Sequence, residues 1–295
     1  MKQSTTLISI FLYLILLSPC EAARQEYIKI ATFNIENLTA KGKNMKQIAQ
    51  IIKYLGLEIV GIEEIVEPKA LDELVKYLGG FKYKITGGTA PIHVGIIYNS
   101  TVIDISEVSE IKTLTLNNER KFRPGLRIKA KVKPDGFDFI LAVVHLKSKV
   151  GGEETDSYRK QQVQCLSNWI DKELQAHPLE KDIIVLGDFN ETLERNPFTP
   201  LSQRKDIKIL TGDLVPGSVS YIGKSGQQKY RSLIDHIILY KGKGGCFDEY
   251  KPASIGLLKD YDKYQGYNVT TPPDGTTLIS DHVPVYASFL TKDND

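Results

Sequence analysis

Hydrophobic residues follow two different spacings along the first third of the chain. Residues 27–33 and 58–62 are short, mostly apolar runs, and this pattern predicts β-strands. Between these runs, residues 45–55 carry apolar side chains three and four positions apart, which indicates a helix with one buried face. Residues 70–78 show the same spacing and predict a second helix. The chain therefore begins with alternating strands and helices.

The rest of the chain is richer in strands. Strand patterns recur at 81–85, 93–98, 126–132, 137–144, 182–186, 234–240 and 283–289. Asp135-Gly136 predicts a hairpin turn, and residues 155–174 predict a long helix that ends before His177-Pro178. Gly-rich and Tyr-rich loops fill the interval 241–279. We expect an α+β fold in which two packed mixed β-sheets are flanked by helices, a four-layer sandwich.

A targeting segment precedes the first strand. Lys2 is followed by an apolar run over 7–17 and then by small residues up to Ala22 and Ala23, which is the layout of a secretory signal peptide. The run is shorter than the ~20 residues that a spanning helix needs, although an uncleaved short anchor is an alternative. We predict a signal peptide over 1–22, one domain over 23–295, and a secreted or periplasmic protein.

Composition changes this picture only by exclusion. Hydrophobic residues make up 41% of the 295 positions, enough for a full core and too many for a disordered chain. Lys and Arg number 38 against 36 Asp and Glu, so the net charge of +2 excludes a basic nucleic-acid-binding arm. Three Cys exclude a disulfide scaffold and a multi-zinc module. Signal cleavage would leave Cys165 and Cys246, either paired or reduced.

Polar side chains with useful chemistry follow several predicted strands. Asn34 comes after the first strand, Glu63-Glu64 after the second, and His145 closes a later strand that is otherwise apolar. Each residue taken alone is explained equally well by a turn, a solvated charge or a structural hydrogen bond. These three positions become informative only in combination with others.

Two further motifs are more specific. In Gly187-Asp188-Phe189-Asn190, the carboxylate of Asp188 and the amide of Asn190 alternate to the same side of a strand end. A proton acceptor beside a hydrogen-bond donor suits attack on a phosphate, although an Asx turn is the alternative. Asp235 lies in an apolar strand and needs a partner, because a buried unpaired carboxylate is costly. His282 is the candidate partner, forming an acid–imidazole pair; the alternative for Asp235 is a salt bridge.

The order of these residues resembles the endonuclease/exonuclease/phosphatase superfamily, which has the deoxyribonuclease-I-like fold. The resemblance covers nearly all of the chain after the signal peptide. It rests on six elements in the family's order: Asn34, Glu63-Glu64, His145, Gly187-Asp188-Phe189-Asn190, Asp235 and Ser280-Asp281-His282. The fourth and sixth motifs are specific, and the others gain weight from their order.

The resemblance implies ligands for a metal ion and for phosphate. Glu64 is the principal metal carboxylate, and Asn34 and Asp281 complete or support the metal site. Oxygen ligands of this kind suit Mg²⁺, with Mn²⁺ or Ca²⁺ as substitutes. Arg123 stands before a strand where the family often keeps an Arg that grips phosphate.

The resemblance also implies catalytic roles. Asp188 and Asn190 orient the attacking water and hold the scissile phosphate. Asp235 orients His282, which acts as general base or as a phosphate-stabilising imidazolium. His145 contacts the phosphate from the opposite side. The expected reaction is in-line hydrolysis of a phosphate ester without a covalent intermediate.

Substrate class is open among several members of the superfamily. We expect a secreted, metal-dependent endonuclease acting on DNA, with RNA as a further substrate, as a monomer without stable membrane association. Cations mixed with aromatic residues in two predicted loops support this expectation: Lys224, Lys229, Tyr230 and Arg231, and Tyr261, Lys263, Tyr264 and Tyr267. A sphingomyelinase or inositol-phosphate phosphatase with the same site is the alternative, and a catalytically silent binding or toxin module is a third.

Overall fold

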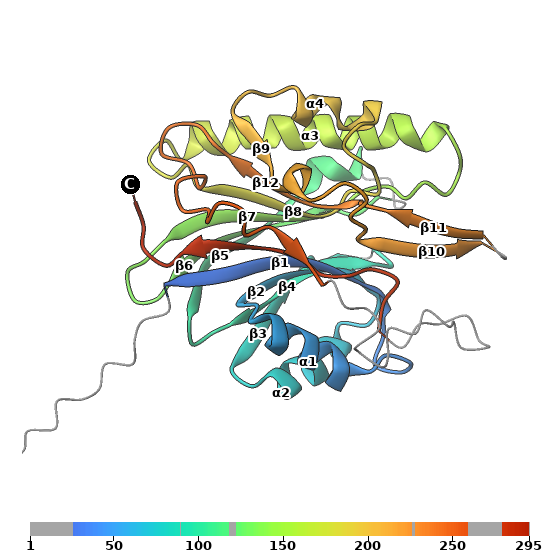
Figure 1. Cartoon of the computed structure of the whole chain (residues 1–295), viewed down its shortest axis with the longest axis horizontal. Coiled ribbons are helices and arrows are strands. Elements are labelled where there is room, and N and C mark those ends of the chain that lie inside the picture. Colours follow the sequence, from blue (N-terminus) through green and yellow to red (C-terminus); the bar gives the residue numbers. More distant parts are fainter. Residues whose placement is uncertain (1–25, 89, 118–121, 226–227, 259–278, 295) are drawn as a thin grey trace, which may run out of the picture.

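Two six-stranded sheets pack face to face in the computed structural model, with helices on their outer faces (Figure 1). The structure describes residues 26–88, 90–117, 122–225, 228–258 and 279–294. Among these residues, none of the helices is long and apolar enough to span a membrane. The predicted signal peptide lies outside the described residues. The α+β, four-layer architecture with two mixed sheets is confirmed.

The first sheet has the strand order β13-β14-β1-β2-β4-β3. Its strands are β1 (Tyr27–Leu38), β2 (Ile59–Ile65), β3 (Phe81–Ile85), β4 (His93–Asn99), β13 (Gly256–Leu257) and β14 (Val285–Leu290). Two helices cover its outer face: α1 (Met45–Leu55) and α2 (Lys69–Leu78). β1 and β2 are parallel neighbours joined through α1, so both strands end at the same edge of the sheet.

The second sheet has the order β5-β6-β7-β8-β12-β9. Its strands are β5 (Ile103–Ile111), β6 (Gly125–Val132), β7 (Asp138–His145), β8 (Ile183–Asp188), β9 (Ile207–Ile209) and β12 (Asp235–Tyr240). The helices α3 (Glu154–Ala176) and α4 (Thr199–Ser202) lie on its outer face (Figure 1), and the 3-10 turns are η1 (Lys112–Thr115), η2 (Asn196–Phe198) and η3 (Leu210–Asp213). A separate hairpin consists of β10 (Tyr221–Ser225) and β11 (Gln228–Ser232).

Two apolar cores hold these layers together. The larger core fills the space between the sheets and under α1 and α2. Gly61 on β2 lets the sheets approach closely, because a Cβ there would lie 2.4 Å from Leu186 Cδ1 on β8. The smaller core packs the second sheet against α3, whose buried face includes Val163, Leu166 and Ile170 as the helical spacing predicts. The central strands of both sheets are therefore held in a fixed relation, with their ends close together.

Several strands were not recognised in the sequence. β5 is an edge strand whose middle is exposed and acidic, so it lacks the apolar alternation that marks a half-buried strand. Lys224, Lys229, Tyr230 and Arg231 were expected in a loop. This expectation was wrong, because their segment forms the β10–β11 hairpin. The short β13 lies within the interval expected to contain only loops. The predicted cluster at 261–267 lies outside the described residues.

The two cysteines within the described residues are free. Cys165 is half-buried and Cys246 is fully buried, and no disulfide joins them. The Cys246 thiol donates to the carbonyl oxygen of Ile183 at 3.1 Å, so it packs as a small core residue against β8. The reduced alternative holds.

Gly187 is required by the close approach of β7 and β8. Its φ is +146°, and a Cβ at this position would lie 1.9 Å from the carbonyl oxygen of Val144. We expect Gly187→Ala to lower the free energy of unfolding by about 2–4 kcal/mol, because backbone strain and a backbone collision add. Gly217→Ala is the control, since Gly217 also has positive φ but no atom within 4 Å of its Cβ position. Equal urea midpoints for the two variants would contradict this explanation.

Candidate active site

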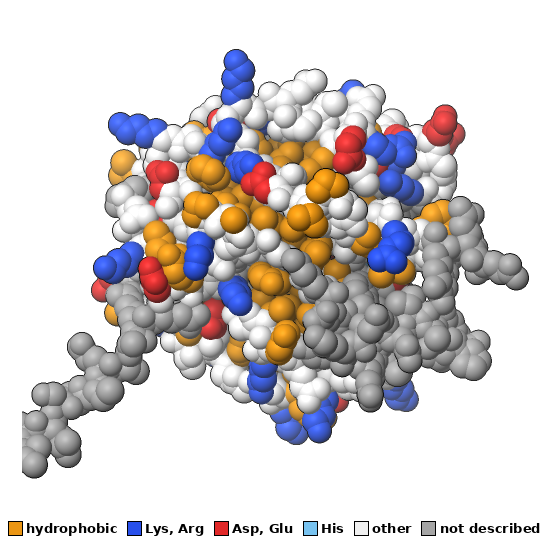
Figure 2. Space-filling model, viewed as in Figure 1, with side chains coloured by type: hydrophobic (Ala, Val, Ile, Leu, Met, Phe, Trp, Pro, Cys, Tyr) orange, Lys and Arg blue, Asp and Glu red, His pale blue; other side chains and the backbone are white. Residues whose placement is uncertain are grey.

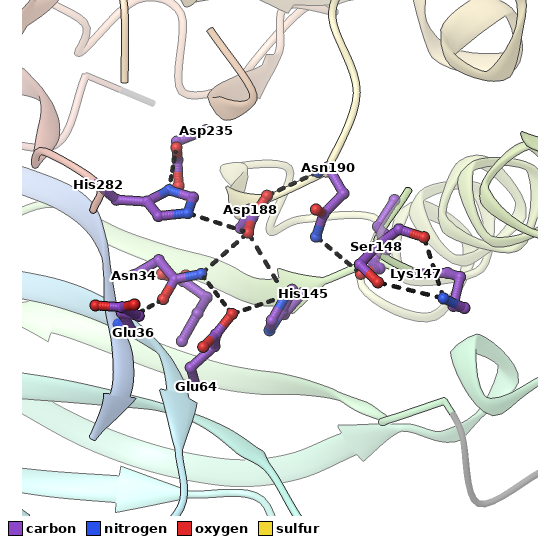
Figure 3. A network of polar contacts seen from close by, with 12 residues as sticks. Asn34, Glu36, Glu64, His145, Lys147, Ser148, Asp188, Asn190, Asp235 and His282 are labelled. Atoms are coloured by element: carbon purple, nitrogen blue, oxygen red, sulfur yellow. Dashed lines mark hydrogen bonds and ion pairs between the residues drawn. The ribbon is translucent and has the colours of Figure 1, made fainter. Parts of the chain in front are cut away.

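A cavity of about 600 Å³ lies where the strand ends of the two sheets meet. Six of the residues predicted from the sequence line it: Glu64, His145, Asp188, Asn190, Asp281 and His282. Figure 3 shows side chains from both sheets pointing toward Asp188. The other three predicted residues, Asn34, Arg123 and Asp235, lie behind this lining and contact it. The structure therefore brings all nine predicted residues together.

Asp188 is the centre of the site. Strand pairing places it opposite His145 on β7 and opposite Asp235 on β12, so the register of the second sheet assembles three of the residues. Asp188 Oδ1 accepts a hydrogen bond from the backbone N–H of Asn190 at 2.7 Å, and Oδ2 accepts one from Asn34 Nδ2 at 3.0 Å. The Asx bond and the shared pocket thus occur together, although they were considered as alternatives.

The expected acid–imidazole pair is present. His282 Nδ1 lies 2.8 Å from Asp235 Oδ2, and both side chains are buried. Ser220 donates its hydroxyl to the same carboxylate oxygen at 2.6 Å. Burial alone would favour neutral imidazole, but Asp235, Asp188 and Asp281 outweigh it and raise the pKa of His282 well above its usual value. These contacts favour the imidazolium form of His282, whose Nε2 lies 3.9 Å from Asp188 Oδ2 and 3.8 Å from Asp281 Oδ1.

His145 behaves differently from His282. Arg123 donates to His145 Nδ1 at 2.7 Å, so the ring proton of the neutral imidazole resides on Nε2. Burial, Arg123 and His282 lower the pKa of His145 well below its usual value. Nε2 lies 3.5 Å from Asp188 Oδ2, where it can donate a hydrogen bond. Arg123 thus lies behind His145 and does not line the cavity, and direct contact between Arg123 and phosphate stays a prediction.

Carboxylates crowd the side of the cavity that belongs to the first sheet. Glu64 Oε1 accepts from Asn34 Nδ2 at 3.3 Å, so Asn34 links Glu64 to Asp188. Burial, reinforced by Asp235 and Glu64, raises the pKa of Asp188 to about 7. Burial, with Glu36 and Glu64 adding, also raises the pKa of Asp281 to about 7. Such mutual repulsion of acids is relieved by a bound cation.

This donor set fits a hard divalent cation. One oxygen each from Glu64 and Asp188 and a nitrogen of His145 lie within 4.8 Å of one another. Because His145 Nδ1 is occupied by Arg123 and Nε2 carries the proton, the carboxylates are the available ligands. Carboxylate oxygens suit Mg²⁺, Mn²⁺ or Ca²⁺. Asn34 was predicted either to complete or to support the metal site. Its amide nitrogen donates to both carboxylates, so Asn34 fits the supporting role.

Sequence reasoning missed residues that support the site from behind, Ser220 and Glu63, and one that lines the cavity, Tyr221. Ser220 holds Asp235, and the ring of Tyr221 lies 4.9 Å from the ring of His282, but both residues follow a segment without any strand signal. Glu63 is fully buried and accepts a hydrogen bond from Thr32 at 2.8 Å. Burial and then Asp235 raise the pKa of Glu63 well above its usual value. Its neighbour Glu64 alone reaches the cavity.

His236 predicts a pH dependence of stability that is separate from catalysis. It is fully buried, with Nε2 2.9 Å from the carbonyl oxygen of Glu191 and Nδ1 2.7 Å from the Thr211 hydroxyl. Burial lowers the pKa of His236 to about 4. Below pH 6.5 the unfolded chain therefore binds a proton that the folded chain rejects until about pH 4. Stability falls as pH falls through this window.

We expect the low pKa of His236 in the folded chain to reduce the free energy of unfolding by about 2 kcal/mol between pH 7.5 and pH 5. Urea unfolding at both pH values measures this loss in wild type. His236→Gln keeps an amide donor but does not titrate, so its loss of stability over the same pH range should be smaller by about the same amount. Parallel pH dependences for the two proteins would rule out His236 as the cause.

Solved structures with the same fold share little sequence with this chain. TDP2 from D. rerio, solved with a single strand DNA product, is 15% identical with a TM-score of 0.69, covering 90% of this chain and 100% of the other. TDP2 from C. elegans, in truncated form, is 18% identical with a TM-score of 0.66, covering 90% and 98%. A mannosyl-6-phosphatase from Bacteroides thetaiotaomicron is 18% identical with a TM-score of 0.65, covering 88% and 98%. No curated protein matches the sequence.

At 15–18% identity the solved structures show only a shared fold, whereas a family model identifies the family. The model for the endonuclease/exonuclease/phosphatase family matches residues 34–291, from Asn34 within β1 to just beyond β14. This range contains all the residues that meet at the cavity. The match supports a hydrolase that acts on phosphate esters. The chain belongs to the endonuclease/exonuclease/phosphatase family.

Proposed function

We propose that this protein is a metal-dependent phosphodiesterase, an endonuclease that hydrolyses DNA by in-line attack of water. The observation that carries the proposal is the position of Asp188. Its carboxylate lies between the imidazolium of His282, 3.9 Å away, and the acids of the first sheet. A proton acceptor and a cationic donor thus face one cavity from neighbouring elements, as phosphoryl transfer to water requires.

The acidic side of the cavity is the metal site in this proposal. Glu64 and Asp188 would hold the ion, with Asp281 nearby and Asn34 fixing the two ligands. When bound, Mg²⁺ supplies charge to polarise a phosphoryl oxygen and to stabilise negative charge in the transition state. Mn²⁺ and Ca²⁺ are the candidate substitutes.

The side chains divide the remaining work. Asp188 lies beside the proposed ion, where its carboxylate would orient the attacking water and accept its proton. His282 donates through Nε2 to a phosphoryl oxygen, and Asp235 keeps its imidazolium charged and oriented. His145 would donate its Nε2 hydrogen to the phosphate from the β7 side of the cavity. Asn190, whose amide is bound to the Leu146 carbonyl oxygen at 3.2 Å, lies where it can hold the phosphate.

Two observations favour different phosphate esters. The similarity to a TDP2 structure that contains a DNA product supports a nucleic-acid substrate, with RNA as a further candidate. The similarity to a mannosyl-6-phosphatase, together with a cavity of about 600 Å³, which lies within the range of small-molecule sites, favours a phosphomonoesterase as second candidate. On the face in Figure 2, cationic and acidic side chains are interspersed, so that face offers no single cationic patch.

A substrate panel distinguishes these functions. Purified protein at fixed Mg²⁺ and salt is given supercoiled plasmid, RNA, sphingomyelin, inositol phosphates and hexose 6-phosphates. We expect nicked and linear plasmid to accumulate without release of inorganic phosphate. Release of inorganic phosphate or phosphocholine with intact plasmid would instead identify a phosphomonoesterase or a sphingomyelinase.

We also propose that the enzyme acts outside the cytoplasm as a monomer, without stable membrane association. The signal-peptide pattern over residues 1–22 supports export. Mass analysis of the exported protein should give a chain that begins near residue 23.

A further inference from the structure

A buried arginine on α3, Arg159, contacts residues that lie next to the cavity lining without lining it themselves. Arg159 is fully buried and donates to four groups, two of which lie on α3 itself and two on other segments. These acceptors are the Glu191 carboxylate (Nε, 3.1 Å), the Lys147 carbonyl oxygen (Nη1, 3.1 Å), the Thr155 hydroxyl (Nη1, 3.0 Å) and the Asp156 carboxylate (Nη2). One planar guanidinium therefore ties α3 to the segment after β7 and to the segment after β8.

Glu191 is the buried counterpart of Arg159. It follows Asn190 directly in the sequence and has a side chain only 1% exposed. While Oε2 accepts from Arg159, Oε1 lies 3.0 Å from Lys149 Nζ on the cavity wall. Burying an ionised pair is costly unless its hydrogen bonds are satisfied, and both groups here have several partners. The pair thus couples Asn190 to the segment that carries Lys149.

That segment, residues 146–150, forms one wall of the cavity through its last three residues. Gln162 on α3 accepts from the Lys147 N–H at 2.9 Å and donates to the Leu114 carbonyl oxygen at 2.9 Å. Asn190 Nδ2 donates to the Leu146 carbonyl oxygen at 3.2 Å. The segment is therefore fixed by α3 from one side and by the Asn190–Glu191 turn from the other.

We infer that Arg159 and Glu191 are positioning residues, which hold Asn190 and the wall 146–150 at the geometry needed for phosphate hydrolysis. Neither residue lines the cavity. Displacing a substrate-positioning group by about 1 Å can reduce a rate by about 10²-fold. The metal ligands should be little affected, since Glu64 comes from the first sheet. Asp188 is fixed by the pairing of β8 with β7 and β12 and by Asn34, none of which depends on Arg159 or Glu191. The catalytic part of this inference rests on the proposed phosphate-ester hydrolysis.

The same helix offers a matched control at its other end. Arg127 is also buried and donates through Nε and Nη2 to Glu173 on α3, with Nη1 2.6 Å from Glu107. None of these three residues lines the cavity. Replacing either arginine by methionine therefore removes a guanidinium that joins α3 to another segment, but only Arg159 is connected to the active site.

We expect Arg159→Met to lower kcat by about 10–100-fold and Arg127→Met to change it less than about 2-fold, with comparable losses in melting temperature. Half-saturating Mg²⁺ should stay within about 2-fold of wild type in both variants. Glu191→Gln, which keeps the side-chain shape, should show the kcat loss at a smaller cost in stability. Equal kcat losses for the Arg159 and Arg127 variants would overturn the inference.

Hydrogen exchange followed by mass spectrometry tests the positioning without any assay of activity. Exchange in the peptide covering 146–150 should rise about 10-fold or more in Arg159→Met and Glu191→Gln, and should match wild type in Arg127→Met. Unchanged exchange in that peptide would overturn the inference even if activity fell. If wild type hydrolyses no phosphate ester, the proposed function fails, while the exchange result still decides whether Arg159 and Glu191 hold the wall.

Discussion

Replacing His282 by alanine is expected to reduce kcat by about 10²–10⁴-fold, the range usual for a group that transfers or shares a proton with the reacting atoms. The imidazolium lines the cavity, and its Nε2 lies within 4 Å of both Asp188 and Asp281. Asp235→Asn should give a loss of similar order, because the amide no longer stabilises the charged imidazole that Asp235 holds at 2.8 Å.

The comparison between these two variants tests the pair as a unit. Losses from residues that act together are not additive, so the double variant should be little worse than His282→Ala alone. His177→Ala is the control, since His177 lies at the C-terminal end of α3 and does not line the cavity. Activity of His282→Ala within about 3-fold of wild type would remove His282 from the mechanism.

The second large effect concerns the metal. Glu64→Gln should raise the Mg²⁺ concentration for half-maximal activity by about 100-fold or more, because a neutral amide replaces a ligand carboxylate that is only partly exposed. Part of the activity should return at high Mg²⁺, since Asp188 and Asp281 remain. Initial rates measured from micromolar to millimolar Mg²⁺ give the shift.

Glu73→Gln serves as the control, because Glu73 is an exposed acid on α2 outside the cavity lining. Its Mg²⁺ dependence should overlay that of wild type. A Glu64→Gln enzyme that saturates at the wild-type Mg²⁺ concentration would show that Glu64 is not a metal ligand. Asp188 would then be the remaining proposed ligand.

Most of the site was predictable because its residues follow strands with clear apolar patterns. Asp188 follows a buried strand, and His145 and Asp235 belong to its two neighbours in the sheet. Strand ends that share one edge bring their side chains together, so the ordered motifs already imply a cluster. The sequence pattern could not predict that β8 pairs with β7 and β12. This strand pairing places His145 and Asp235 opposite Asp188.

The supporting residues were less accessible to prediction, because their roles depend on side-chain contacts between distant segments. Ser220 lies in a polar stretch and reaches Asp235 only after the hairpin folds back. Arg159 and Glu191 are charged residues that a pattern assigns to the surface, yet both are buried because they satisfy each other. Arg123 was predicted to grip phosphate, which stays a prediction, but its contact with His145 could not be read from the sequence.

Plasmid nicking tests the central claim most directly. Supercoiled DNA is incubated with wild-type protein in Mg²⁺, with wild-type protein in EDTA, and with Asp188→Ala in Mg²⁺. The account predicts nicked plasmid in the first reaction, and in the other two either none or a rate lower by at least about 10²-fold. Nicking that persists in EDTA or in Asp188→Ala would contradict a metal-dependent mechanism at this site, and the absence of nicking in all three would contradict the proposed DNA substrate.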